Sequence, residues 1–144
     1  PRLKFHRDFA AGRVLAQCMA DRLAALPRPG AMVPIPLHRA RLRHRGYDQA
    51  LELARPLARA LGIPLVDRAL GRRTATRAQS RLDADARRRN LRDAFHVDAG
   101  IPLPPHVVLV DDVMTTGATL HAAAGVLHRA GVARVDAWVC ARVA

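Results

Sequence analysis

Two adjacent acids and a cluster of threonines are the residues of this sequence best suited to chemistry. Asp111 and Asp112 follow four apolar residues, Val107 to Val110, a run typical of a strand buried on both faces. Two acids placed directly after a buried strand are costly to desolvate unless a ligand uses them. Paired carboxylates can accept hydrogen bonds from the two vicinal hydroxyls of a ribose.

The residues after the two acids are suited to holding a phosphate group. Three threonines supply hydroxyls, and Gly117 permits close approach of the backbone to a ligand. Helical spacing then begins, so the loop of residues 113–117 is predicted to end at a helix N-terminus, where free N–H groups and the helix dipole favour an anion. The residues at that spacing are Leu120, Ala123, Ala124, Leu127 and Ala130.

Three other classes of protein place an acid after an apolar strand, and each lacks support here. A nucleoside triphosphatase needs GxxxxGK[ST], but no glycine of this sequence precedes a lysine. A phosphorylation-receiver domain carries its acids near its start, whereas here they lie late in the chain. A dinucleotide-binding fold needs GxGxxG, which is absent from the sequence. A sugar phosphate remains, with the alternative that the acids only cap the following turn.

A second informative stretch is rich in arginine. The formal net charge is +12 and Lys4 is the only lysine, so arginine carries nearly all the positive charge. Within residues 36–49, arginine occupies every second position from Arg39 to Arg45. If this segment is extended, its arginines form a strip suited to pyrophosphate or to a nucleic-acid backbone. The alternative is a basic surface loop in a chain with an arginine-rich composition.

The remaining pattern predicts the elements that position these residues. Helices are expected over residues 9–26 and 50–61, and short strands over residues 31–35, 64–70, 93–97 and 133–143. These elements predict an α/β fold: a single three-layer domain, residues 1–144, with a mostly parallel central sheet flanked by helices. The apolar face expected for the first helix comprises Ala11, Leu15, Cys18, Met19, Leu23 and Leu26.

Residues 71–94 are predicted to form a flexible arm, because this arginine-rich segment lacks a clear apolar face. We expect the arm to close over a phosphorylated ligand, and a solvated, partly helical excursion is the alternative. The residues proposed to contact the ligand are Arg72, Arg73, Thr76 and Gln79.

No apolar run approaches the roughly 18 residues needed to span a bilayer, and the first residues lack the apolar core of a signal peptide. We therefore expect a cytoplasmic protein that does not insert into membranes. Cys18 and Cys140 are not spaced as metal ligands, and we expect both to be buried thiols in a reducing compartment.

The central stretch, VVLVDDVMTTGAT, resembles the phosphoribosyl pyrophosphate signature of type I phosphoribosyltransferases, and the chain as a whole resembles the ComF family associated with natural competence. The similarity includes VPIPLHRARLRHRGYDQA, the arm with Gln79 and the N-terminal KFHRD. Two features depart from the family pattern. The sequence has no four-cysteine zinc module at its N-terminus, and Asp48 stands where the family usually has Asn.

The resemblance implies a role for each part of the site. Asp111 and Asp112 would be the catalytic acids that bind the ribose hydroxyls, and the arm would contribute Arg73, Thr76 and Gln79. Magnesium would be the cofactor, held mainly by oxygens of the ligand rather than by a direct protein ligand. The pyrophosphate would face Leu37, His38 and Arg39, and the 5-phosphate would bind Thr115, Thr116, Gly117, Ala118 and Thr119.

Two functions follow from these features. The favoured one is a magnesium-dependent phosphoribosyltransferase that binds phosphoribosyl pyrophosphate, transfers to an acceptor that the sequence does not identify, and serves DNA uptake. The alternative is a non-catalytic competence protein that senses phosphoribosyl pyrophosphate or binds single-stranded DNA. Aromatic residues make up only 3% of the chain, so DNA binding would be mostly electrostatic rather than by base stacking.

Overall fold

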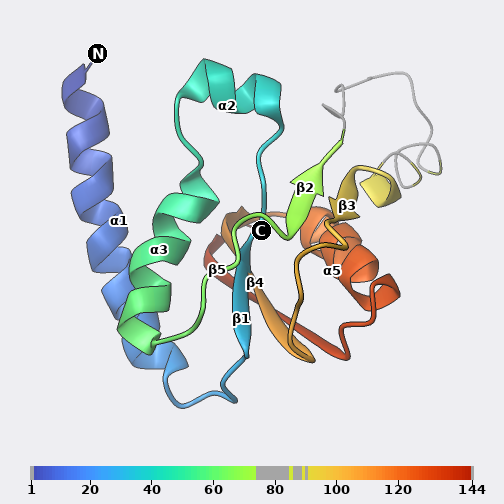
Figure 1. Ribbon diagram of the computed structural model, residues 1–144. Helices are drawn as coiled ribbons and strands as arrows, with labels where there is room; N and C mark the ends of the chain where they lie inside the picture. The colour runs from blue at the N-terminus through green and yellow to red at the C-terminus, as the bar shows by residue number, and fades with distance from the viewer. Residues whose placement is uncertain (1, 74–84, 86–88, 90, 144) are drawn as a thin grey trace.

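The computed structural model describes residues 2–73, 85, 89 and 91–143, and its centre is a parallel sheet (Figure 1). The strands β1 (Ala31–Pro34), β4 (His106–Met114) and β5 (Arg134–Arg142) lie in the order β1-β4-β5. A single parallel bridge joins Met32 to Leu65 at the outer edge of β1. Since β4 is the middle strand, both of its edges are hydrogen-bonded and its residues 107–110 are fully buried.

Helices cover both faces of the sheet (Figure 1). On one face, α1 (Arg2–Leu23) and α3 (Gln49–Leu61) pack on a cluster that includes Val108 and Val110. On the other face, α5 (Ala118–Arg129) packs on a cluster that includes Val107 and Leu109. This alternation along β4 is the period of two expected for a strand buried on both sides. The prediction of a three-layer α/β arrangement around a mostly parallel sheet is confirmed.

The apolar face predicted for the first helix is only partly confirmed, because Met19 and Leu23 pack against the core whereas other predicted residues do not. Leu15 is 45% exposed, Leu26 lies beyond the helix and is 49% exposed, and Cys18 is exposed. Cys140 is half-buried, so neither thiol is buried as expected. The face that packs on α3 instead carries small residues, because alanines on both helices allow the two backbones to approach closely. The buried alanines are Ala16 and Ala20 on α1 and Ala54 and Ala58 on α3.

The connection after β1 is helical rather than extended. The short helix α2 (Arg39–Arg45) has His38 as its N-cap, whose Nδ1 accepts a hydrogen bond from the Ala40 N–H at 3.1 Å. The helix ends at Gly46, which has a left-handed φ of 79°. Alternate positions of a helix lie on different sides, so the predicted strip of arginines on one side of this segment is wrong.

The predicted arm is anchored by an antiparallel hairpin. Strand β2 (Leu70–Arg72) pairs with β3 (Phe95–Val97), so residues 71 and 72 of the predicted arm belong to a strand. The Arg72 guanidinium lies 5.3 Å from the centroid of the Phe95 ring, and the Arg73 N–H donates to Ala94 O at 2.8 Å. Thr76 and Gln79 lie outside the described residues. Within the part of the chain that the structure describes, no helix is both long and apolar enough to cross a membrane.

Replacing Gly71 by Ala is expected to destabilise the protein, because a Cβ at this position would lie 2.6 Å from Nε2 of His96. Relieving this overlap requires His96 to move within the hairpin and should cost about 1–2 kcal/mol in free energy of unfolding. Urea denaturation measures the change. Gly12→Ala is the control, since nothing lies within 4 Å of a Cβ at residue 12 in α1. Equal stability of the two variants would contradict the prediction.

Candidate functional site

The two predicted acids lie near the carboxyl end of β4, inside the strand rather than after it. The Asp112 N–H donates to Asp111 Oδ1 at 2.9 Å, and the Val113 N–H donates to Asp112 Oδ1 at 2.8 Å. These bonds restrict the orientation of both carboxylates. Although successive residues of a strand alternate between its two faces, the carboxyl groups of Asp111 and Asp112 lie within hydrogen-bonding reach of each other at this end of β4, so one ligand can contact both.

A third carboxylate, Asp48, joins this site and was not among the predicted site residues. It is the N-cap of α3, where its Oδ1 accepts from the Leu51 N–H at 3.2 Å and the Leu37 backbone also donates to it. Its charge and that of Asp112 repel each other. Asp48 lies at the end of the connection from β1 to α3, Asp112 lies near the carboxyl end of β4, and the carboxyl ends of adjacent parallel strands meet at one edge of a sheet. That rule was the available signal for Asp48.

Burial at this edge changes the pKa of two of these carboxyl groups, Asp111 and Asp48. Burial raises the pKa of Asp111 to about 7, and the neighbouring Asp112 and Asp48 carboxylates add to this effect. Burial also raises the pKa of Asp48, although hydrogen bonds from backbone N–H groups oppose the change. The site therefore holds more negative charge than its surroundings neutralise. Hydroxyl donors or a cation placed against these oxygens would lower both pKa values.

The predicted phosphate loop is short and leads directly into α5. Residues 115–117 connect β4 to the helix, and Gly117 is the N-cap with a left-handed φ of 80°, a conformation that favours glycine. Gly117 has no side chain that could accept hydrogen bonds from the first N–H groups of α5, and the first turn of α5 contains no acidic residue. The Ala118 N–H donates to Thr116 Oγ1 at a long 3.3 Å. The N-terminus of α5 thus keeps the free N–H groups that bind an anion.

The predicted pyrophosphate segment begins at the same edge of the sheet. The Ile35 N–H donates to Val110 O at 2.9 Å, so the residues after Ile35 emerge beside the acids of β4. Leu37 and His38 are half-buried, and Arg39 is exposed on the first turn of α2. Arg73 directly follows β2, at the end of the β2–β3 hairpin where the predicted arm begins. The structure therefore unites the acids, the phosphate loop and residues 37–39 at one edge.

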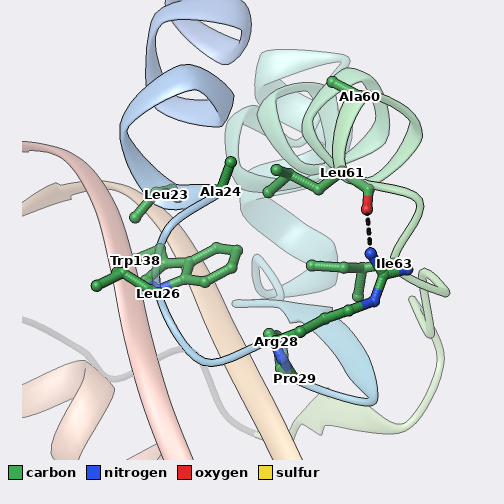
Figure 2. Close-up of a pocket in the computed structure, with 9 residues that line it drawn as sticks. All are labelled: Leu23, Ala24, Leu26, Arg28, Pro29, Ala60, Leu61, Ile63 and Trp138. Carbon is green, nitrogen blue, oxygen red and sulfur yellow. Dashed lines mark hydrogen bonds between the residues drawn. The ribbon is translucent and has the colours of Figure 1, made fainter.

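An apolar cavity of about 220 Å³ lies away from this edge (Figure 2). It is bounded by Leu23, Leu61 and Trp138 and by the residues that precede β1, at the amino ends of the strands. The Arg28 guanidinium at this cavity donates to Leu61 O at 2.7 Å (Figure 2). It also donates to Gly62 O, and the two bonds cap the C-terminus of α3. Arg28 thus has a structural role here, and the apolar lining does not suit a sugar phosphate.

Comparison with known proteins places this geometry in a family. Residues 48–144 match the model of the phosphoribosyl transferase domain, and the chain belongs to that family. Competence protein F of Haemophilus influenzae is 38% identical over 98% of this chain and 65% of its own length. DNA utilization protein YhgH of Salmonella typhi is 38% identical over 97% of this chain and 64% of its own length. The resemblance to competence-associated proteins is confirmed, and the chain spans about 65% of these relatives.

A solved structure supports the same fold. Glutamine phosphoribosylpyrophosphate amidotransferase from B. subtilis superposes with a TM-score of 0.64, covering 92% of this chain and 26% of that chain. At 20% identity this likeness concerns the fold alone. The type I phosphoribosyltransferase fold predicted from the sequence is confirmed.

The raised pKa of Asp111 predicts a specific dependence of stability on pH. The folded state keeps a proton on Asp111 up to about pH 7, whereas the unfolded chain releases it near 3.8. The folded state therefore binds more protons between these values, and its free energy of unfolding falls as pH rises through this window. Asp111→Asn, measured by urea denaturation at about pH 8, should be more stable than the native protein by about 1 kcal/mol or more.

The control for this substitution is Asp67→Asn, which changes an exposed acid outside the site and should leave the pH profile unaltered. A native profile that stays flat between about pH 4 and pH 7, or loss of stability in Asp111→Asn at high pH, would contradict the account.

Proposed function

We propose that this site binds phosphoribosyl pyrophosphate. One observation carries the proposal: carboxylates whose charge no cation offsets lie at the same edge of the sheet as a helix N-terminus without a side-chain cap. Asp111 and Asp112 would accept hydrogen bonds from the ribose hydroxyls, and residues 115–119 would hold the 5-phosphate. The pyrophosphate would face residues 37–39. A ligand with hydroxyl donors at one end and a phosphate at the other matches both halves of the site.

Magnesium is proposed as the cofactor, and the donor set fits it. Carboxylate oxygens are ligands that Mg²⁺ accepts, and the ion commonly keeps waters and substrate phosphates in its shell. Among the described residues, no three His, Cys, Asp or Glu side chains form a metal-binding group. We therefore propose that the ligand's oxygens hold most of the ion, with the carboxylates of Asp111 and Asp112 close by. Bound magnesium would neutralise charge on the departing pyrophosphate.

The residues of the chain would act by positioning and electrostatics. Hydrogen bonds from the ribose to Asp111 and Asp112 fix the sugar, and the loop fixes its phosphate, so the anomeric carbon is held at a defined place. The same carboxylates stabilise the positive charge that develops on the sugar as pyrophosphate leaves. The reaction proposed is displacement at the anomeric carbon without a covalent intermediate on the protein.

The biological setting proposed is DNA utilization in the cytoplasm. The names of the relatives, competence protein F and DNA utilization protein, support the first part. Cys18 is an exposed free thiol, which suits a reducing compartment. A non-catalytic protein that binds phosphoribosyl pyrophosphate or single-stranded DNA is the second candidate. The net charge of +12 favours it as well, because a polyanion gains from any basic surface.

Calorimetry with phosphoribosyl pyrophosphate and magnesium tests the binding proposal. The double variant Asp111→Asn, Asp112→Asn removes two charged acceptors at nearly constant shape and should weaken binding at least about 100-fold. Asp67→Asn is the matched control, because it removes an exposed acid away from the site and should bind as the native protein does. Equal binding by the double variant and the native protein would refute the proposed site.

Release of pyrophosphate during incubation with candidate nucleobases separates the two functions. Release that requires Asp111 and Asp112 supports a transferase. Tight binding without release for any acceptor supports the non-catalytic alternative.

Binding of phosphoribosyl pyrophosphate should also depend on pH through Asp111. Its raised pKa of about 7 means that hydroxyl binding to the ionised carboxylate displaces a proton below neutral pH. Affinity should therefore rise by about tenfold from about pH 6 to pH 8. The ligand's own phosphate titrates near pH 6, so Asp111→Asn supplies the baseline. An identical pH dependence in the native protein and in Asp111→Asn would contradict the role assigned to Asp111.

A further inference from the structure

A groove of about 690 Å³ begins at the phosphate loop and continues along the outer side of α5. Its near end is formed by residues 116–118, which the proposed function assigns to the 5-phosphate. From there it follows one side of the helix to Arg129, in the last turn. Leu91 and Arg92, just before β3, form the opposite wall. The twelve residues of α5 span about 18 Å, so the groove is long enough for a nucleoside.

The lining of the groove combines positive charge with a smooth apolar floor. Arg92 and Arg129 are both exposed, and His121 lies between the loop and Arg129. Among the described residues that line the groove, none is acidic. Ala122 and Gly125 form its floor, and small side chains let a flat ring lie close to the helix. This combination suits a ligand that carries phosphate and an uncharged ring system.

The order of the parts along the chain restricts which ligand can reach the groove. The acids lie near the carboxyl end of β4, the loop follows that strand, and the groove starts at the loop. A ribose on Asp111 and Asp112 with its phosphate in the loop can therefore enter the groove only through a group attached to that phosphate. Phosphoribosyl pyrophosphate ends at its 5-phosphate and leaves the groove empty. Arg129, in the last turn of α5, lies at the end of the helix opposite to the phosphate loop and beyond the reach of this ligand.

We propose that the site also accepts a ribose 5-phosphate whose phosphate is joined to a second nucleoside, with that nucleoside lying in the α5 groove. The inference rests on the proposed function, because it uses the same acids and the same phosphate loop. Arg129 and Arg92 bind the additional phosphate or the polar edges of the second nucleoside. Two sources carry this chemistry: a nucleoside diphosphate ribose, and the 3′ end of a ribonucleotide strand, where the vicinal hydroxyls are free.

Displacement of phosphoribosyl pyrophosphate, followed by calorimetry in the presence of magnesium, tests the proposal with two competitors. ADP-ribose represents the first source, and the ribodinucleotide adenylyl-adenosine represents the second. At least one should displace phosphoribosyl pyrophosphate from the native protein. Arg129→Ala should weaken that competitor about tenfold while leaving phosphoribosyl pyrophosphate binding unchanged. If the 3′ end of a ribonucleotide strand is the source, a dinucleotide that carries a 3′-phosphate should no longer displace phosphoribosyl pyrophosphate.

Two further variants keep the test specific. Gly125→Leu fills the groove without touching the loop, and the nearest atom to its Cβ is the flexible end of Arg129 at 3.4 Å. Leucine is also a better helix former than glycine, so the fold should be kept. This variant should no longer bind the competitor and should still bind phosphoribosyl pyrophosphate with the native affinity. Arg59→Ala removes the same charge from an exposed position on α3 and should change neither ligand.

The outcomes separate this inference from the function on which it rests. If phosphoribosyl pyrophosphate binds but neither competitor displaces it, the groove proposal is overturned and the proposed function stands. If Arg129→Ala weakens both ligands equally, or no more than Arg59→Ala does, the arginine acts only through overall charge and the proposal is again overturned. If phosphoribosyl pyrophosphate itself does not bind, both proposals fall.

Discussion

Burial of neighbouring carboxylates at one edge of the sheet is the physical constraint on which the site depends. Asp111 and Asp112 lie near the carboxyl end of β4 and Asp48 begins α3 beside them; burial, and to a smaller extent the neighbouring charges, raises the pKa of Asp111 and of Asp48. A fold that needed only a turn at this place could use neutral side chains at less cost. The acids become favourable once hydroxyl donors or a cation occupy the space between them. The energetic cost of burying these carboxylates thus indicates a ligand. Because their charge is negative, that ligand is expected to present hydrogen-bond donors or a cation.

The rest of the structure places these negative carboxylates beside the positive N-terminus of α5. The uncapped N-terminus of α5 begins only a few residues beyond Asp112, so a negative site and a positive site are adjacent. The middle position of β4 makes the arrangement rigid, because hydrogen bonds on both edges and side chains on both faces fix residues 107–110. A sugar phosphate satisfies both sites together, whereas a simple anion or a simple cation satisfies only one.

Local patterns in the sequence were enough to predict the core of the site. Four buried apolar residues, two acids and a threonine-rich loop before a helical repeat each depend on neighbours along the chain, and the structure retains all of them. The features that the sequence did not reveal depend on contacts between distant segments. Asp48 lies near Asp112 only because β1 and β4 are adjacent. The buried face of α1 depends on its contact with α3, since Ala16 and Ala20 share one cluster with Ala54 and Ala58 of that distant helix. The helical state of residues 39–45 is the exception, because it depends on local capping by His38 and Gly46, a signal that the alternation of arginines conceals.

The most direct test of the central claim is the pKa of the Asp111 carboxyl group. It is measured from the NMR signal of the carboxyl carbon as pH is varied, with and without phosphoribosyl pyrophosphate and magnesium. The account predicts titration at about 7 in the free protein, and a shift to clearly lower pH when the ribose hydroxyls bind the carboxylate. A free-protein value near the ordinary 3.8, or a raised value that the ligand leaves unchanged, would contradict it.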